Sequence, residues 1–241
     1  MHKNLKNHNS SCLDCNNINC IINSNLIKGN HLKLIENKKI LKCKKGQQFI
    51  MEGALVNGLF IIMEGKAKVF RTGINGREQI VRFAKEGEII GHRGFGTEEY
   101  YPIGAIALED TLLCSFTKEH LQEALLNNAK LSYDMMLFYA NELNRSENKV
   151  KTISQMTVRE RVIDTLLYIN RKFGTTDGFL NLTLSRKEYA DYAGTTEEQV
   201  IRTFSSLKKE GLINTRARHI SIFDVDALKA EISQHNFFLD S

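Results

Sequence analysis

Hydrophobic residues follow two different periods along the chain. From 39 to 116 the apolar residues form short, often alternating runs that end at glycines, as in 59–65. Many short strands at regular spacing are typical of a small antiparallel β-barrel or jelly roll. From Lys118 onward the apolar residues recur every three or four positions, which predicts helices. The predicted fold class is therefore α+β.

A long helix is predicted over residues 129–155, with a mostly apolar seam along one face. The spacing between seam residues alternates between three and four, as in a coiled coil. Because the other faces are polar, we expect the same helix of a second subunit to cover the seam, in a homodimer. The alternative is a helix packed on its own barrel. The predicted seam consists of Met136, Tyr139, Leu143, Ser146, Val150 and Ile153.

The stretch 184–213 has the pattern of two short helices joined by a glycine. Residues 185–188 (SRKE) form a capping box that begins the first helix. Gly194 allows the left-handed backbone that a tight turn between helices needs. Thr195 or Thr196 then caps the second helix, whose apolar positions recur at helical spacing and must face a core. These positions are Val200, Phe204 and Leu207.

The outer face of this second helix and the segment after it predict a DNA interface. Glu198 and Arg202 lie one turn apart, and residues 212–222 have the pattern of strand, basic turn and strand. Together these features predict a winged helix-turn-helix, which inserts its second helix into the major groove. The alternative is an ordinary helical hairpin, in which Glu198 completes a capping box with Thr195. The predicted DNA contacts are Ser185, Arg186, Thr196, Glu198, Gln199, Arg202, Arg216 and Arg218.

Composition and charge limit the function further. The 241 residues carry a net charge of +5, but residues 156–241 hold twelve basic and twelve acidic side chains. We therefore expect few phosphate contacts and a shallow dependence of DNA binding on salt. Without a membrane-spanning run or a signal peptide, the chain is expected to be soluble and cytoplasmic. No nucleophile–base pair, phosphate loop or catalytic carboxylate pair is evident, so we expect no enzyme.

These patterns predict four segments. Residues 1–25 form a flexible segment with cysteines, 26–128 a β-barrel sensor domain, 129–155 the dimerisation helix, and 156–241 the winged helix-turn-helix domain. Each of the two larger segments is long enough to bury a core of its own. The long helix connects them.

Five cysteines in a cytoplasmic protein favour metal or redox chemistry over structural disulfides. Cys12, Cys15 and Cys20 form a C-x2-C-x4-C pattern, whose thiolates can converge on one soft metal centre. A closed site needs a fourth ligand, for which Cys114 is the best candidate and Cys43 the substitute. The alternatives are a structural zinc ion, a redox-sensing disulfide, and buried cysteines that act only as small apolar residues.

The order of barrel, long helix and winged helix-turn-helix resembles the Crp/Fnr superfamily of bacterial transcription regulators. The most specific part is 194–202, GTTEEQVIR, which is similar to the recognition helix of that family. The resemblance implies a cyclic-nucleotide-binding-like barrel, a homodimer, and RNA polymerase as a further partner. It also implies that Glu198 accepts from a cytosine and Arg202 donates to a guanine in a palindromic site with a TGA core. Glu197 stands where the cyclic-AMP receptor branch has arginine, so the outer bases should differ.

The barrel departs from the cyclic-AMP receptor branch at the residues that hold the ligand. That branch holds ribose and phosphate with Gly-Glu and Arg-Ser pairs, where this chain has 91–93 (GHR) and 102–103 (PI). Proline and isoleucine offer a cyclic phosphate neither charge nor hydroxyl, which argues against cyclic-nucleotide binding. His92 alone is weak support for haem.

The cysteines resemble those of the fumarate-and-nitrate-reduction regulator (FNR) branch, in which an N-terminal triplet and one barrel cysteine bind an oxygen-labile [4Fe–4S] cluster. By this resemblance Cys12, Cys15, Cys20 and Cys114 are the ligands, and oxygen weakens the dimer and DNA binding. The second gap of the triplet is five residues in that branch and four here. Ser146 stands on the seam where oxygen-sensing relatives carry an acidic residue. The alternatives are a regulator controlled by thiol oxidation, zinc, haem or a small ligand, and an electron-transfer iron–sulfur protein.

Overall fold

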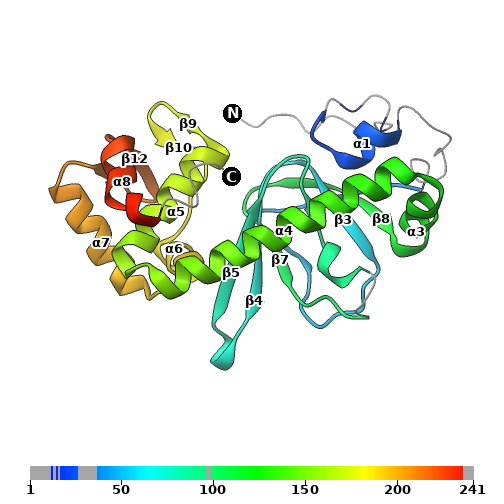
Figure 1. The fold of residues 1–241 in the computed structure, drawn as a ribbon, viewed down its shortest axis with the longest axis horizontal. Helices are drawn as coiled ribbons and strands as arrows, with labels where there is room; N and C mark the ends of the chain where they lie inside the picture. Colours follow the sequence, from blue (N-terminus) through cyan, green and yellow to red (C-terminus); the bar gives the residue numbers. More distant parts are fainter. Residues whose placement is uncertain (1–11, 13–14, 16, 27–36, 96–98, 236–241) are drawn as a thin grey trace. The chain divides into compact units, whose positions relative to one another are not determined.

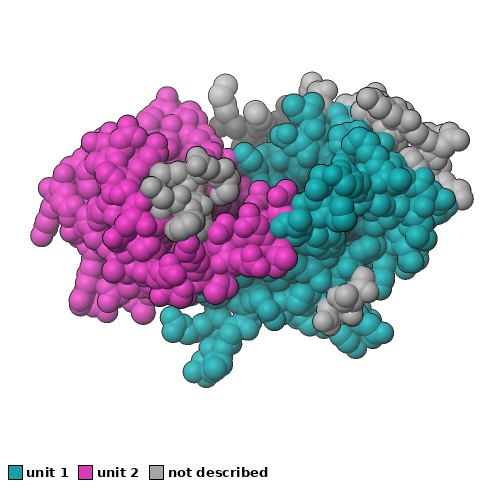
Figure 2. Space-filling view, viewed as in Figure 1, with its two compact units in different colours: residues 1–140 teal, residues 141–241 magenta. Residues whose placement is uncertain are grey.

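The computed structural model describes residues 12, 15, 17–26, 37–95 and 99–235. The chain divides into two compact units, residues 1–140 and 141–241, which Figure 2 shows in teal and magenta. The division falls inside the long helix. The four segments expected from the sequence, with boundaries at both ends of that helix, stay a prediction.

The first unit contains a jelly roll of two antiparallel four-stranded sheets (Figure 1), which confirms the predicted fold class. Gly65 turns the chain between two strands with a φ of 102°, and a side chain there would clash with Thr111. The first sheet has the order β1 (Lys39–Cys43), β8 (Thr111–Thr117), β3 (Gly58–Glu64) and β6 (Ile89–Ile90). The second sheet has the order β2 (Gln48–Ile50), β7 (Gly104–Ala107), β4 (Ala67–Thr72) and β5 (Glu78–Ala84).

Both faces of the first sheet are buried, because its side chains alternate between two hydrophobic clusters. On β3, Phe60 and Ile62 belong to the inner cluster between the sheets, while Leu59 and Ile61 belong to an outer cluster. Helices cover the outer cluster. These are α1 (Ile21–Leu26), α3 (Lys118–Asn127) and the first turns of α4 (Ala129–Gln155).

Helix α4 has the predicted bounds. Leu131 and Met135 are buried in the outer cluster and fix its first turns on the jelly roll. The predicted seam residues are all exposed, from 37% for Tyr139 to 68% for Val150. The Tyr139 hydroxyl also donates to the His92 carbonyl at 2.8 Å. No helix within the described ranges is both long and apolar enough to span a lipid bilayer.

The second unit is the predicted winged helix-turn-helix. Its small sheet has the order β11-β12-β10-β9, and the hairpin of β11 and β12 is the wing. The helices are α5 (Val158–Phe173), α6 (Arg186–Ala193), α7 (Glu197–Lys209) and α8 (Val225–Glu231). The strands are β9 (Thr175–Thr176), β10 (Phe179–Leu180), β11 (Ile213–Arg216) and β12 (His219–Ile222). Short 3₁₀ turns are η2 (Ile74–Gly76) and η3 (His92–Gly94) in the first unit and η4 (Ser233–His235) in the second.

Candidate DNA-binding face and cysteine site

Hydrogen bonds fix both ends of α6. The Ser185 hydroxyl accepts from the Glu188 amide at 3.2 Å, and the Glu188 carboxylate accepts from the Ser185 amide at 2.8 Å. Gly194 ends the helix in the left-handed conformation, with a φ of 67°. Arg161 of α5 donates to the Ala193 and Gly194 carbonyls at 2.8 and 3.2 Å. The turn between α6 and α7 is therefore held from both sides.

The cap of α7 leaves its acidic side chains free of the capping box. Thr196, and not Thr195, caps the helix by accepting from the Gln199 amide at 3.3 Å. Glu198 is therefore not the third residue after the cap. Its carboxylate lies on the outer face of the helix, where it is exposed.

Glu198 and Arg202 project together from α7. The Arg202 guanidinium lies 2.5 Å from the Glu198 carboxylate, and the two side chains are 70% and 71% exposed. An ion pair this exposed contributes about 0–1 kcal/mol to stability. The pair can therefore separate at little cost when both groups meet other partners.

A buried face positions α7 in the unit. Val200, Phe204 and Leu207 are buried, as their spacing predicts. The Phe204 ring meets Tyr189 of α6 edge to face, with ring centroids 5.1 Å apart. The buried side of α7 and its exposed pair are therefore on different faces.

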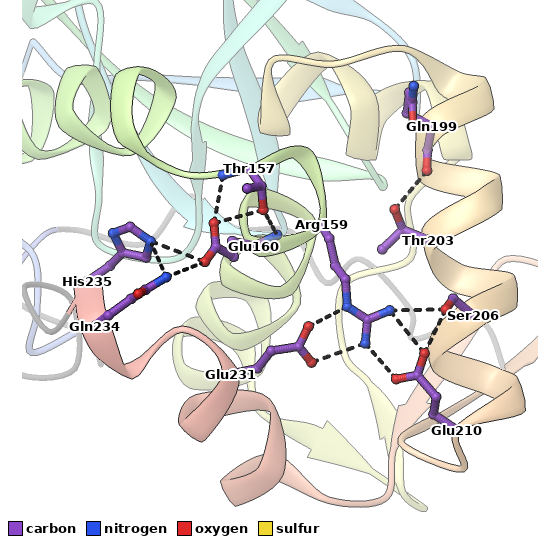
Figure 3. Close-up of polar contacts among 10 residues, drawn as sticks. All are labelled: Thr157, Arg159, Glu160, Gln199, Thr203, Ser206, Glu210, Glu231, Gln234 and His235. Atoms are coloured by element: carbon purple, nitrogen blue, oxygen red, sulfur yellow. Dashed lines mark hydrogen bonds and ion pairs between the residues drawn. The ribbon is translucent and has the colours of Figure 1, made fainter.

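Arg159 of α5 holds the other end of α7 (Figure 3). Its guanidinium donates to the Ser206 hydroxyl at 3.1 Å and to the Glu210 carboxylate at 2.6 Å. It also forms an ion pair with Glu231 at the end of α8. Hydrogen bonds to Glu231 and Glu210 raise the pKa of Arg159 above its ordinary value. This network could not be predicted from the sequence, because its partners are distant in the chain.

Glu160 links the start of α5 to η4 (Figure 3). The Thr157 amide and hydroxyl donate to its carboxylate at 2.7 and 2.8 Å. Gln234 donates to the other oxygen at 2.9 Å, and His235 Nε2 lies 3.2 Å from it. Burial raises the pKa of Glu160, but these hydrogen bonds outweigh burial and lower the pKa to about 2.

The other expected DNA contacts differ in their exposure and in whether they already have hydrogen-bond partners within the unit. Gln199, Arg216 and Arg218 are exposed; Arg216 ends β11 and Arg218 lies in the wing turn. The hydroxyls of Ser185 and Thr196 take part in helix caps. These two hydroxyls already have partners within the unit.

Arg186 has a packing role in this structure. Its guanidinium lies 4.6 Å from the centroid of the Phe204 ring. It also donates to the carbonyl of Ala217 in the wing turn at 3.3 Å. Arg186 therefore connects α6, α7 and the wing, and it is only half-exposed.

The N-terminal cysteines lie beside the outer face of the first sheet. Cys20 and Cys114 belong to the same hydrophobic cluster, while Cys12 is buried and Cys15 half-buried. The Cys15 amide donates to the Cys12 carbonyl at 3.3 Å. The structure therefore brings the triplet and Cys114 of β8 to one side of the jelly roll.

The four thiols also influence one another electrostatically. The pKa of Cys114 is raised to about 12, mainly by burial. Lys38 lowers this pKa, and the charges of Cys12, Cys20 and Cys15 raise it further. Burial also raises the pKa values of Cys12 and Cys20. Thiols in such a group bind protons tightly unless a positive centre replaces the protons.

Cys43 lies on the other face of the same sheet. It belongs to the inner cluster with Leu113, whereas Cys114 belongs to the outer one. Burial raises the pKa of Cys43, without a contribution from another thiol. Of the two candidates for a fourth ligand, the structure brings Cys114 near the triplet.

Two asparagines of α1 connect the cysteine segment to α4. The Asn23 side chain donates to the Cys15 carbonyl at 2.8 Å. The Asn25 side chain donates to the Asp134 carboxylate of α4, also at 2.8 Å. Neither asparagine was predicted, because single polar residues in a polar segment give no periodic signal.

Two of the positions compared with cyclic-nucleotide binders, His92 and Ile103, are buried. Ile103 is buried in the inner cluster. His92 is buried too, and its ring lies edge-on to those of Phe138 and Tyr139, with centroids 4.8 and 5.7 Å away. His92 therefore forms part of the packing between η3 and α4.

Two family matches cover most of the fold just described. Residues 40–128 match the cyclic nucleotide-binding domain family, and residues 160–231 match the Crp-like helix-turn-helix domain family. The chain belongs to the Crp/Fnr family of transcription regulators. Members of this family are DNA-binding regulators, and the helix-turn-helix match contains both α6 and α7.

Relatives of this Crp/Fnr regulator include transcriptional activators. The chain is 28% identical to the transcriptional activator protein FnrA of Stutzerimonas stutzeri over 184 residues, 75% of each chain. It is 27% identical to the fumarate and nitrate reduction regulatory protein of Escherichia coli (strain K12) over 205 residues, 84% of this chain and 80% of that one.

Solved structures of the family share the fold. FixK2 from Bradyrhizobium japonicum matches with a TM-score of 0.72 and 23% identity, over 80% of this chain and 96% of that one. The regulator CLP of Xanthomonas campestris matches with a TM-score of 0.72 and 17% identity, over 80% and 98%. At these identities the likeness establishes the fold alone.

The cysteine site fits a soft metal centre by the chemistry of its donors. Four thiols gather there, and cysteine thiolates are the ligands of iron–sulfur clusters and of structural zinc. Among the described residues, no three His, Cys, Asp or Glu side chains are already arranged as a metal-binding group. The donors are therefore close to one another, but not yet in the geometry of a ligand cage.

Proposed function

We propose that this Crp/Fnr regulator binds a palindromic DNA site with a TGA core as a homodimer. We further propose that it responds to oxygen through a [4Fe–4S] cluster held by Cys12, Cys15, Cys20 and Cys114. The observation that carries this proposal is the gathering of four cysteines on one face of the jelly roll, while Cys43 lies on the other. RNA polymerase is an expected further partner.

The exposed face of α7 has the chemistry to recognise this DNA site. The Glu198 carboxylate can accept from the N4 amino group of cytosine, and the Arg202 guanidinium can donate to O6 and N7 of guanine. Arg216 and Arg218, exposed beside the wing turn, can contact phosphates. The helix caps and Arg159 hold α7 in place, so these side chains need little reorganisation on binding.

The seam of α4 supports a homodimer. Leu143 and Val150 are 61% and 68% exposed, although both are aliphatic. An exposed, mostly apolar stripe is typical of an interaction surface. Pairing two copies of α4 about a two-fold axis would present two α7 helices, as two half-sites one DNA turn apart require.

The cysteine site shares its surroundings with the dimer helix. Cys20 and Cys114 lie in the same cluster as Leu131 and Met135 of α4. Asn25, five residues after Cys20, is hydrogen-bonded to Asp134 of α4. An iron–sulfur cluster bound there would supply an oxygen-sensitive centre. Ligation would join Cys12, Cys15 and Cys20 to one centre close to Asn25 and its bond to Asp134, so that α4 senses the state of the cysteines.

Iron and sulfide analysis after anaerobic purification tests the proposal. Wild type, Cys114→Ser and Cys43→Ser form the matched set, because each variant removes one buried thiol from the same sheet. We expect iron and sulfide in equal amounts in wild type and Cys43→Ser, and a large loss of both in Cys114→Ser.

Three results would contradict the cluster. Wild type that stays free of iron after anaerobic reconstitution would exclude it. Zinc without sulfide would favour a structural metal site, and a disulfide between triplet cysteines would favour control by thiol oxidation.

A further result would contradict Cys114 as a ligand. Equal iron loss in both serine variants would mean that the destabilised fold, and not ligation, causes the loss.

A further inference from the structure

One apolar side chain stands on the polar outer face of α7. Ile201 is 48% exposed. The other large apolar residues of this helix, which the structure describes throughout, are buried. Ile201 belongs to neither hydrophobic cluster of the jelly roll and is absent from the buried core of its own unit. Folding of α7 therefore does not require an isoleucine at this position.

Ile201 lies between the two side chains expected to contact bases. It comes three residues after Glu198 and directly before Arg202, and all three are exposed. On a helix, residues three or four apart have Cβ atoms about 5–6 Å from each other. A groove that receives Glu198 and Arg202 therefore also receives Ile201.

The major groove offers one apolar group to such a side chain, the C5 methyl of thymine. Ile201 can neither donate nor accept a hydrogen bond. Polar base edges pressed against it would lose water without gaining a partner. Because a β-branched side chain has few rotamers in a helix, the methyl groups of Ile201 have a defined position.

We propose that Ile201 is a specificity-determining residue that recognises the C5 methyl group of a thymine next to the base pairs contacted by Glu198 and Arg202. This proposal rests on the proposed function, because it requires α7 to enter the major groove. It adds a contact that neither charge nor hydrogen bonding at Glu198 and Arg202 supplies.

Replacing thymine by 2′-deoxyuridine tests the contact, because it removes only the methyl group. Sites are first selected from random DNA with the full-length chain, purified without oxygen. Each thymine of the selected half-site is then replaced in turn, symmetrically in both halves. At one position we expect about a four-fold loss of affinity per half-site, which is the value of burying one methyl group.

Two variants assign that loss to Ile201. Ile201→Ser should bind more weakly and should no longer distinguish thymine from uracil at that position. Ile74→Ser is the matched control, because Ile74 is an exposed isoleucine of η2 in the other unit. It should keep the wild-type preference for thymine.

Different failures have different meanings. Equal wild-type affinity for every uracil-substituted site would overturn this proposal while leaving specific DNA binding intact. Unchanged thymine preference in Ile201→Ser would assign the methyl contact to another residue, and so overturn it as well. If no site can be selected, the proposed function fails and this proposal with it. The wild-type measurement needs no variant, so a folding defect in Ile201→Ser cannot hide the result.

Discussion

Helix α7 is fixed at its start by the Thr196 cap and near its end by Arg159. The cysteine segment instead packs Cys20 into the outer cluster and is linked to its surroundings by the side chains of Asn23 and Asn25. In α7 the hydrogen bonds and the buried face leave the outer side chains ready to meet a ligand. In the cysteine segment the thiols lie near one another without forming a metal-binding group among the described residues. Helix α7 therefore has its outer side chains in place without a ligand, whereas the cysteine site would reach its binding geometry only with a metal centre.

This difference indicates where control acts. We expect a helix held by caps and a core to keep its structure whatever the cysteine site binds. The cysteine site, in contrast, is connected to α4 through the hydrogen bond between Asn25 and Asp134. We therefore expect regulation to change the pairing of two α4 helices, and not the structure of α7.

Breaking the dimer should have the largest effect. Leu143→Glu would set two like charges against each other across the seam, at a cost of several kcal/mol. We expect monomers in sedimentation and a loss of operator affinity of about 100-fold or more. Asn141→Glu, which adds the same charge away from the seam residues, is the control and should remain dimeric. A dimeric Leu143→Glu with normal affinity would show that α4 does not form the interface.

Removing one base contact should have a smaller effect. Arg202→Ala should cost about 1–3 kcal/mol of binding free energy and relax discrimination at one guanine. Lys208→Ala, at an exposed position further along α7, should weaken binding equally for all sequences. Titrations against sites with each base pair substituted would measure both. If Arg202→Ala still discriminates among the substituted sites as strongly as wild type, Arg202 takes no part in base recognition.

The smallest effect on DNA binding is expected from Glu160, which acts on the stability of the winged unit. Because the folded pKa of Glu160, about 2, lies below its ordinary value of 4.5, its ionised form stabilises the fold above pH 4.5. This contribution, at most about 3 kcal/mol, is lost as the pH falls from 4.5 toward 2. In urea titrations of the full-length chain, the stability advantage of wild type over Glu160→Gln should shrink over that range. Glu147→Gln, at an exposed position of α4, should show no such pH dependence. A stability difference between wild type and Glu160→Gln that stays constant over this pH range would contradict the lowered pKa of Glu160.

Local signals in the sequence predicted the two helices of the candidate DNA-binding face well. The capping box at 185–188, the left-handed Gly194 and the spacing of Val200, Phe204 and Leu207 all depend on neighbours within a few residues. The choice between Thr195 and Thr196 remained open, because each could begin the helix. The structure selects Thr196, which frees Glu198 from the capping box.

Contacts between distant segments could not be predicted in this way. Arg159 meets Glu231 and Glu210 only after α5, α7 and α8 have packed together. The choice between Cys114 and Cys43 likewise depends on which face of the sheet the N-terminal segment covers. The strands β9 and β10 have two residues each, too few for an alternating pattern to appear.

Operator affinity before and after exposure to air most directly tests the link between the cysteine site and the DNA-binding face. It is measured on wild type, Cys114→Ser and Cys43→Ser. We predict that wild type and Cys43→Ser bind tightly without oxygen and lose at least about ten-fold in affinity in air, a coupling of about 1.4 kcal/mol. Cys114→Ser should bind weakly under both conditions. Tight binding by all three proteins, unchanged by air, would contradict a link between the cysteine site and the DNA-binding face.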